Sequence, residues 1–383
     1  MLLTLSHEQR VALKGNQYFS ERFLFADIGF CIASDNPTYI DRLRRIYQAF
    51  ITPDLADIAL TCYMLDRCDF FTGSCVIIDN VLYEFPQGDR FFGKAEIFVL
   101  QRVIDAIATS FLLHAGVVAK DGNGYVIYAP TGFGKTTFVL RLVADGYKFL
   151  SDEYCLIHAD SLTIEPFARR VGIKQTSPFL SLMHQRVNDA LWCDGKYYVK
   201  CDDLFPNSSG ASCRAKYFLM LSHDAPDHRL ETDNHIVQIV FFNDMQHDLQ
   251  RLMNICGGRI VRRMPQDYCI EYICELPKKR MVISALHRFL QKHHSNIYFF
   301  TPVREHKTDF TNTPKLYPMK KSDATFEILS NLINRSPASA FLASQGGKHQ
   351  ALIMKIAAFL KEVDCYRLVT GNLDAMAQLV SAL

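Results

Sequence analysis

Ala129-Pro130-Thr131-Gly132-Phe133-Gly134-Lys135-Thr136 is the stretch of sequence that decides the fold. It satisfies the relaxed form of the phosphate-loop pattern, with Ala in the place of the first Gly. The pattern needs small residues, here Gly132 and Gly134, because successive backbone N–H groups turn inward around phosphate oxygens. A strand is expected before the stretch and an amphipathic helix after it, over Thr136–Ala144. The positive end of that helix would face the anion, so the setting predicts a nucleotide-binding loop.

Individual residues of this stretch, called the glycine loop (residues 129–136), predict separate contacts with a nucleotide. Lys135 would reach the terminal phosphates as a point charge and take part in catalysis, and the Thr136 hydroxyl would ligate Mg²⁺. The alternative is a strand-to-helix turn that binds nothing, which the Gly-Lys-Thr offset in this setting disfavours. ATP and Mg²⁺ are therefore the expected cofactors. The expected nucleotide-binding residues are Thr131, Gly132, Phe133, Gly134, Lys135, Thr136 and Thr137.

An acidic pair, Asp152-Glu153, follows the glycine loop after only one short helix and one expected strand, Tyr147–Leu150. If that strand lies beside the strand that precedes the loop, both carboxylates emerge near Lys135 and Thr136. One carboxylate would then bind Mg²⁺, and the other would take the proton from an attacking hydroxyl. The alternative is a solvated turn, the usual place of an isolated acidic pair, which the proximity to the loop disfavours.

These residues together resemble a known family, the HPr kinase/phosphorylase-like kinases, which share a fold with the ATP-dependent phosphoenolpyruvate carboxykinases. The similarity is densest over residues 111–174, and the general layout extends over most of the chain. Its segments are Leu113-His114-Ala115-Gly116, a hairpin, Thr131–Thr137, Ser151-Asp152-Glu153, and more weakly Pro166–Ile173, Tyr366-Arg367-Leu368 and Gly371-Asn372-Leu373. The resemblance implies a mixed α/β fold with a P-loop nucleotide-binding core of this type.

The resemblance also implies roles for polar residues of the core. Asp152 would be the general base on the acceptor hydroxyl, Glu153 a metal ligand, and His114 the partner that orients or tunes the catalytic carboxylate. Taken alone, His114 would be a satisfied histidine at a strand end, and its place just before the hairpin favours the catalytic role. Arg169 or Arg170 is a candidate contact to the transferring phosphoryl group or substrate. A solvated pair of arginines after a strand is the alternative.

The chain departs from the family pattern in two places. Bifunctional members have a Ser followed by an acidic residue after the loop Lys, whereas this chain has Thr136-Thr137. They also carry an acidic-x-Arg-Gly element, and its nearest equivalent, residues 165–170, lacks the Arg-Gly step. These differences bear on the phosphorylase half-reaction and on recognition of the carrier protein HPr more than on kinase activity with another acceptor.

The leading hypothesis is an ATP- and Mg²⁺-dependent kinase that transfers the γ-phosphoryl group to a hydroxyl, expected on Ser or Thr of a protein or peptide. Two alternatives stay open. One is a small-molecule kinase on the same scaffold, and the other is a nucleotide-binding regulatory or assembly protein with little chemistry. We expect the loops outside the phosphate site to determine acceptor specificity, and their sequence contains no motif that identifies a ligand. The resembled bifunctional family forms oligomers, which leaves a homo-oligomer open.

Composition narrows the class of protein further. The 383 residues carry 42 Lys+Arg against 40 Asp+Glu, so no global field points to nucleic acid or an anionic membrane as a partner. The 12 cysteines fall in no Cys-x-x-Cys or zinc-finger spacing, which favours reduced thiols inside a cell. No stretch approaches the roughly 18 apolar residues of a spanning helix, and the start lacks the features of a signal peptide. A cytoplasmic protein is expected.

Turns and breakers divide the chain into three regions. We expect an N-terminal α+β region over residues 1–110, a P-loop kinase core over residues 111–322, and a mainly helical C-terminal lobe over residues 323–383. Within the core, Phe111–Ala119 is expected as one strand, followed by a tight turn at residues 121–124. The region 177–212 is expected to be loop-rich.

Overall fold

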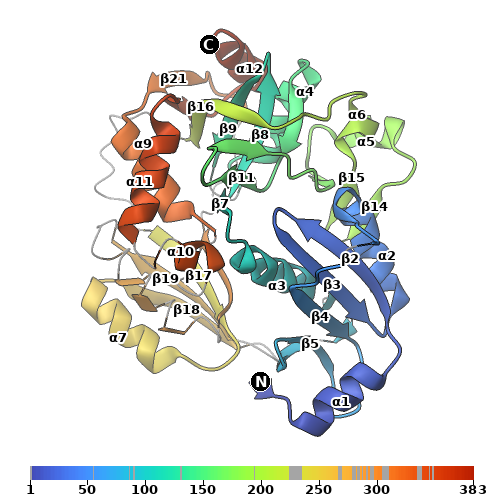
Figure 1. The fold of residues 1–383 in the computed structure, drawn as a ribbon. Helices are drawn as coiled ribbons and strands as arrows, with labels where there is room; N and C mark the ends of the chain where they lie inside the picture. The colour runs from blue at the N-terminus through green and yellow to red at the C-terminus, as the bar shows by residue number, and fades with distance from the viewer. Residues whose placement is uncertain are drawn as a thin grey trace. The chain divides into compact units, whose positions relative to one another are not determined.

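The computed structural model describes most of the chain, and the described residues build a mixed α/β fold with four β-sheets (Figure 1). The described residues are 2–54, 56–85, 87–88, 91–129, 132–193, 195–223, 235–265, 270–277, 282, 285–286, 288–289, 292–293, 297–303, 310–333, 339–344, 346 and 349–383. Among them, no helix combines the length and the apolar character that crossing a bilayer requires.

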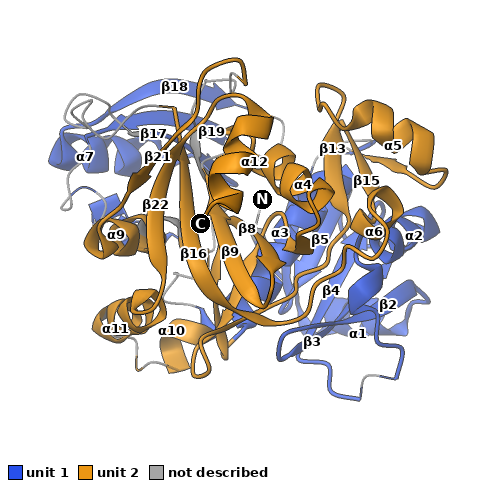
Figure 2. Ribbon diagram, turned by 90° about the horizontal axis from the view of Figure 1, so that it is seen from above, with its two compact units in different colours: residues 1–107, 233–303, 336–340 blue, residues 108–232, 304–335, 341–383 orange. Residues whose placement is uncertain are grey.

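The chain divides into two compact units, coloured in Figure 2. Unit 1 comprises residues 1–107, 233–303 and 336–340, and unit 2 comprises residues 108–232, 304–335 and 341–383. This division differs from the three regions expected from sequence. The segment 233–303 groups with the N-terminal residues, and most of the C-terminal region groups with the glycine loop. The physical reason in unit 2 is strand pairing, because β22 (Asp364–Val369) runs parallel to β16 (Cys213–Ser222) within one sheet.

Unit 1 contains a six-stranded sheet with three helices. In spatial order its strands are β1 (Leu2–Thr4), β6 (Val81–Phe85), β5 (Ser74–Ile78), β4 (Leu60–Leu65), β3 (Ile28–Ser34) and β2 (Phe19–Phe25). The helices are α1 (His7–Gly15), α2 (Pro37–Ile46) and α3 (Phe91–Ala106), with a 3₁₀ turn at Gln48–Phe50. Asp79 and Asn80 take φ angles of 51° and 64°, which confirms the tight connection expected at Asn80 between two β-rich runs.

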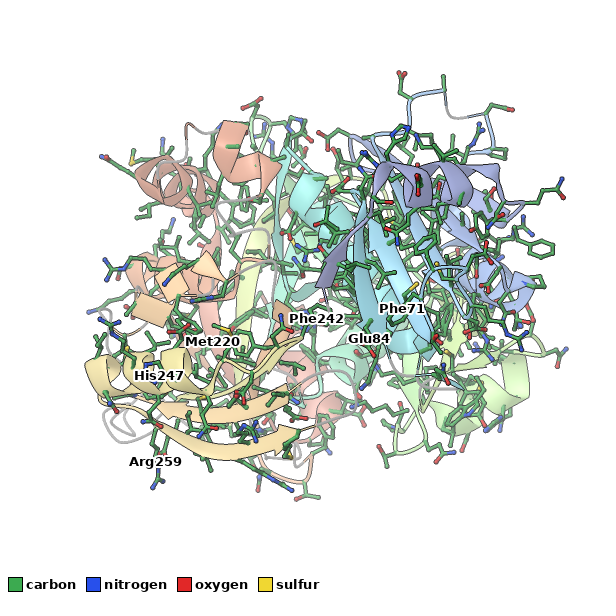
Figure 3. The ribbon with its side chains drawn as sticks, turned by 90° about the horizontal axis from the view of Figure 1, so that it is seen from below. Phe71, Glu84, Met220, Phe242, His247 and Arg259 are labelled. Carbon is green, nitrogen blue, oxygen red and sulfur yellow. The ribbon has the colours of Figure 1, made fainter. Side chains whose placement is uncertain are left out.

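A second, antiparallel sheet completes unit 1. Its strands, in spatial order, are β18 (Arg259–Pro265), β19 (Ile270–Leu276), β17 (His235–Phe241) and β20 (Ile297–Val303), with helix α7 (Gln246–Cys256). Phe242, labelled in Figure 3, follows β17, and its ring lies 5.5 Å from that of Tyr83 and 5.7 Å from that of Phe98. These aromatic contacts join residues distant in sequence, which explains why segment 233–303 belongs to the N-terminal unit.

Unit 2 is built on the largest sheet. Seven strands follow the order β10 (Lys148–Ser151), β8 (Ala115–Lys120), β9 (Asn123–Tyr128), β16, β12 (Thr163–Glu165), β11 (Cys155–His158) and β7 (Ser110–Leu113). β22 pairs with β16, and β21 (Lys315–Pro318) pairs with β22. The expectation of one strand over 111–119 is wrong, because the chain breaks at His114. β7 pairs with β11, whereas β8 pairs with β9 and β10.

Helices cover both faces of this sheet (Figure 1). On one face, Val118 and Ile127 share a buried core with residues of α4 (Lys135–Ala144) and α12 (Leu373–Ser381). On the other face, Val117 and Val126 share a core with residues of α9 (Lys321–Asn331), α10 (Ala340–Ser344) and α11 (His349–Leu360). Neighbouring residues of one strand thus enter different cores, as strand geometry requires. The helical pattern expected after residue 323, with one strand interruption, is confirmed.

A three-stranded sheet also belongs to unit 2. Its order is β13 (Val171–Lys174), β15 (Lys196–Val199) and β14 (Leu191–Cys193), and the short helices α5 (Leu180–Arg186) and α6 (Cys201–Leu204) lie in the same part of the chain. The loop-rich expectation for residues 177–212 is therefore wrong in part. Strands of three and four residues are too short to show a period in the sequence.

Candidate active site

Three strands of unit 2 bring the candidate residues to one edge of the largest sheet. β9 and β10 both run antiparallel to β8, which lies between them, so they run parallel to each other. Their carboxyl ends meet at the edge where β8 begins. β9 leads into the glycine loop, β10 leads into Asp152-Glu153, and His114 precedes β8. Adjacency of the acidic strand and the strand before the loop was the condition expected from the sequence for bringing the carboxylates to the loop. In the structure β8 separates β10 from β9, yet both strands end at the same edge.

The backbone of the glycine loop takes conformations that favour glycine. Gly132 and Gly134 have φ angles of 91° and 77°. A Cβ atom on Gly134 would lie 2.6 Å from Cζ of Phe310, so this residue also lacks space for a side chain. Gly134 is the N-cap of α4, and no side chain forms a capping hydrogen bond there. The first turn of α4 therefore offers its backbone N–H groups to an incoming anion. Thr131 lies outside the described residues.

Close packing places α4 against the acidic pair. A Cβ atom on Gly116 of β8 would lie 2.5 Å from Cγ2 of Val139 on α4 and 3.6 Å from Cα of Asp152. Glycine at this position thus lets helix α4 approach β8 closely, and the end of β10 lies in ordinary contact with the same site. At the same edge, the Thr136 hydroxyl donates a hydrogen bond of 3.3 Å to Oδ2 of Asp152. The predicted metal ligand and the predicted base are in contact.

Lys135 is the least satisfied polar residue of the site. Its side chain is 9% exposed, and Nζ has no hydrogen-bond partner among the described residues. Burial lowers the pKa of Lys135 to about 8, although the charges of Asp152 and Glu153 act to raise it. An ammonium held away from water without a partner costs free energy. The residue at the start of α4 is therefore arranged to receive a negatively charged group.

The two carboxylates differ in their surroundings. Burial raises the pKa of Asp152, and the negative charge of Glu153 raises it further. Burial also acts to raise the pKa of Glu153, but the positive charges of Arg169 and Lys196 outweigh it and lower the pKa below its usual range. Arg169 Nη1 donates a hydrogen bond to Oε2 of Glu153. Asp152 is thus the carboxylate that takes up a proton more readily, and Glu153 is held as an anion.

His114 lies just before β8, and its ring packs edge-on against Tyr154 at a centroid distance of 6.2 Å. Burial and the charge of Lys135 lower the pKa of His114 to about 3, so the imidazole is neutral. In the described part of the chain, no hydrogen bond joins this ring to Asp152 or Glu153. The role of His114 in orienting the catalytic carboxylate stays a prediction.

Arg169 and Arg170 are 6% and 7% exposed, so the alternative of a solvated pair is wrong. Their side chains serve different places. Arg169 bonds to Glu153, and its guanidinium also lies 5.4 Å from the ring centroid of Tyr198 on β15. Arg170 donates to the carbonyl oxygen of Asp189 at 3.1 Å and to its carboxylate at 3.4 Å, which anchors the segment before β14. Arg169 therefore belongs to the site, whereas Arg170 bonds to Asp189 and has no contact with the acidic pair among the hydrogen bonds of the described residues.

One further cation belongs to this site and was absent from the predicted set. Lys196, the first residue of β15, acts electrostatically on Lys135, Asp152, Glu153 and His114. The sequence does contain a signal for it. Asp-Gly at residues 194–195 separates two short runs, and Asp-Gly is a strong hairpin signal that would have placed Lys196 at the start of a strand.

The residues present fit a nucleotide with a magnesium ion. Mg²⁺ at nucleotide sites takes one or two carboxylates together with phosphate oxygens, and Thr136, Asp152 and Glu153 offer such ligands beside an anion-accepting loop. Within the described ranges, no group of three or more His, Cys, Asp or Glu side chains is placed to hold a metal ion.

Comparison with known proteins adds little. No protein-family model matches the sequence, and no curated protein matches it. Among solved structures, the chain is similar to the Hpr(Ser) kinase/phosphatase from Coxiella burnetii, with 15% sequence identity over 33% of this chain and 70% of that chain. The TM-score is 0.21. A similarity this low assigns no activity to the chain, so the chemistry rests on the geometry of the site.

Proposed function

We propose that the protein binds ATP with Mg²⁺ at the glycine loop and transfers the γ-phosphoryl group to a hydroxyl, with Ser or Thr of a protein or peptide as the expected acceptor. The observation that carries this proposal is Lys135. Its ammonium is buried without a partner among the described residues, and it begins a helix whose N-terminus has no side-chain cap. Two glycines with positive φ precede it. This combination favours the terminal phosphates of a nucleotide over any neutral ligand.

The chain's own residues divide the work of phosphoryl transfer. Lys135 and the backbone of the loop hold the phosphates, and Thr136 with Glu153 or Asp152 holds the metal ion. When bound, Mg²⁺ neutralises charge on the phosphoryl oxygens. Arg169 adds positive charge on the side of Glu153. These groups place the γ-phosphorus for attack in a partly buried, charge-balanced setting.

Asp152 is the proposed general base, because it is buried, its pKa is raised, and it ends the strand beside the loop. In the proposed step, Asp152 takes the proton of the acceptor hydroxyl, and the acceptor oxygen forms a new bond to the γ-phosphorus. The bond between the γ-phosphorus and the β–γ bridging oxygen breaks, and ADP leaves with that electron pair. Glu153, paired with Arg169, is the proposed metal ligand.

Two variants test the proposal. Lys135→Ala should weaken ATP binding by about 10- to 100-fold, because a charged hydrogen bond to phosphate is lost. Asp152→Asn should leave ATP binding nearly unchanged and lower transfer by roughly 10²- to 10⁴-fold, because only the proton acceptor is lost. Calorimetry measures the first quantity, and transfer from γ-labelled ATP to separate protein and metabolite fractions of a lysate measures the second. Lys14→Ala, on exposed α1, is the matched control.

The results distinguish the hypotheses. Substantial transfer by Lys135→Ala would contradict the proposal. Tight ATP binding without loss of the γ-phosphate to any acceptor, and without any effect of Asp152→Asn, would favour a nucleotide-binding regulatory protein. Label that enters only the metabolite fraction would identify a small-molecule kinase.

A further inference from the structure

The three-stranded sheet of unit 2 has one core face and one face that leads to the site. Val199 of β15 and its neighbour Val171 of β13 belong to the hydrophobic core. Side chains alternate along a strand, so Lys196 and Tyr198 of β15 lie on the opposite face. That face carries two lysines and an aromatic ring. It is called the lysine face and consists of Gly172, Lys174, Lys196 and Tyr198.

Contacts connect the lysine face to the acidic pair without a break. A Cβ atom on Gly172 would lie 3.0 Å from Cδ of Lys196 and 3.6 Å from Cε1 of Tyr198, so both side chains lie over this glycine. The guanidinium of Arg169 lies over the Tyr198 ring and bonds to Glu153. Lys196 is thus linked through packed neighbours to the carboxylate that the proposed function assigns to the metal ion.

The lysine face also brings two like charges together. Lys174 and Lys196 are directly opposite each other in the antiparallel register of β13 and β15. Like charges directly opposite on two strands are destabilising. No ion pair or hydrogen bond joins either ammonium group to another residue in the described part of the chain. The charge of Lys196 already acts on Asp152 and Glu153, in the direction that lowers the pKa of both. An anion placed between the two lysines would relieve their repulsion and give Lys174 a partner.

We propose that Lys196 and Lys174 form a second anion subsite, which holds a phosphate or carboxylate group of the phosphoryl acceptor. The proposal rests on the proposed function and gives it a substrate class: the acceptor is a hydroxyl compound that carries its own anionic group. The hydroxyl would reach Asp152 while the anionic group lies on the lysine face. The first anion subsite, at Lys135, remains occupied by the nucleotide.

Binding of a small anion tests the subsite without any nucleotide. The protein is the Lys135→Ala variant, in which the first anion site is weakened, and the probe is glycerol 3-phosphate with glycerol as its neutral match. Calorimetry and the fluorescence of Trp192 follow the titration. Trp192 is the single tryptophan, 45% exposed, and its ring lies 4.6 Å from that of Tyr197. Trp192 and Tyr197 lie on the face opposite the lysine face, so the fluorescence reports a change of the sheet and calorimetry reports the binding itself.

Glycerol 3-phosphate should bind this variant and glycerol should not. Adding Lys196→Gln should weaken binding by about 10-fold or more, and Lys174→Gln should weaken it less because Lys174 is more exposed. Lys200→Gln, an exposed neutral substitution just after β15, is the matched control and should have no effect. No binding of glycerol 3-phosphate, or equal binding with and without Lys196, would overturn the subsite.

Transfer kinetics then distinguish a small-molecule acceptor that carries a phosphate from a peptide acceptor that carries carboxylates. The wild type and Lys196→Gln receive γ-labelled ATP with glycerol 3-phosphate or glycerol, and with a Ser peptide flanked by Glu or by Gln. The protein should use the anionic acceptor of each pair, and Lys196→Gln should raise the KM for that acceptor by about 10-fold, a larger factor than any change in the KM for ATP. Equal use of a neutral partner would overturn the inference. Absence of ATP binding to the wild type would instead sink the proposed function, and the nucleotide-free titration would still test the subsite.

Discussion

Helices α2 and α4 both begin beside a sheet, but they satisfy their first turns in opposite ways. In unit 1, Asn36 precedes α2 and accepts a hydrogen bond of 3.0 Å from the backbone N–H of Thr38, with Pro37 at the first helical position. In unit 2, Gly134 precedes α4 and provides no side chain, and buried Lys135 follows it. The first arrangement satisfies the helix end from within the chain. The second leaves it for a ligand, which is the difference between a structural and a functional helix start.

The largest expected effect comes from filling the space at the start of α4. Gly134→Ala adds a Cβ at positive φ that would lie 2.6 Å from Cζ of Phe310, so the loop or the Phe310 ring must shift and the loop backbone is strained. ATP affinity should fall on the order of 100-fold, about 2.8 kcal/mol, since the backbone N–H groups lose their alignment. Titration calorimetry with ATP and Mg²⁺ measures the change.

Gly146→Ala is the matched control for that experiment. Gly146 has a similar φ of 91°, lies just after α4, and has open space around a Cβ atom. Its substitution should cost roughly 1 kcal/mol of stability from backbone strain and leave ATP affinity unchanged. Equal losses of ATP affinity in the two variants would show that the loop's role is not specific.

Gly116→Ala tests the start of α4 from β8, the strand against which this helix packs. The new Cβ would lie 2.5 Å from Cγ2 of Val139, which should push α4 away from β8 and cost about 1–3 kcal/mol in chemical unfolding. Phosphoryl transfer should fall as well, because Thr136 and Asp152 separate. Combining it with Val139→Ala removes the clashing methyl group and should restore part of the lost activity. No recovery in the double variant would contradict the steric explanation.

Removing the cap of α2 has the smallest expected effect. Asn36→Ala should lower the free energy of unfolding by about 1 kcal/mol, because the N–H of Thr38 loses its acceptor. ATP affinity should stay at the wild-type value. Urea unfolding and calorimetry check the two quantities, and a loss of ATP affinity here would remove the contrast between the two helix starts.

The sequence predicted those parts of the fold and the site that are determined by residues a few positions apart. The glycine loop, α4 and the turn at Asp79-Asn80 depend on residues a few positions apart, and the structure contains the helix and the turn. The closeness of Asp152 to Thr136 was also expected, although the supposed strand pairing was not found. Two strands that end at the same edge can bring their ends together with a third strand between them.

Long-range pairing set the limit of what the sequence could predict. The break at His114 depends on β7 and β8 pairing with different strands, which no residue near His114 indicates. Likewise, the pairing of β13 with β15 positions Lys196, whose side chain packs over Gly172. Segment 233–303 packs in unit 1 through aromatic contacts such as that of Phe242 with Tyr83.

The pairing of β16 with β22 also sets the time at which the site can form. On α4, Arg141 forms an ion pair of 2.8 Å with Asp374 of α12, 233 residues later in the chain. During synthesis, the glycine loop therefore leaves the ribosome long before the strand and helix that complete its unit. Until then β16 lacks one parallel neighbour, and an open strand edge can pair with another chain. Contacts of such sequence separation fold slowly, so newly made protein should depend on protection of that edge.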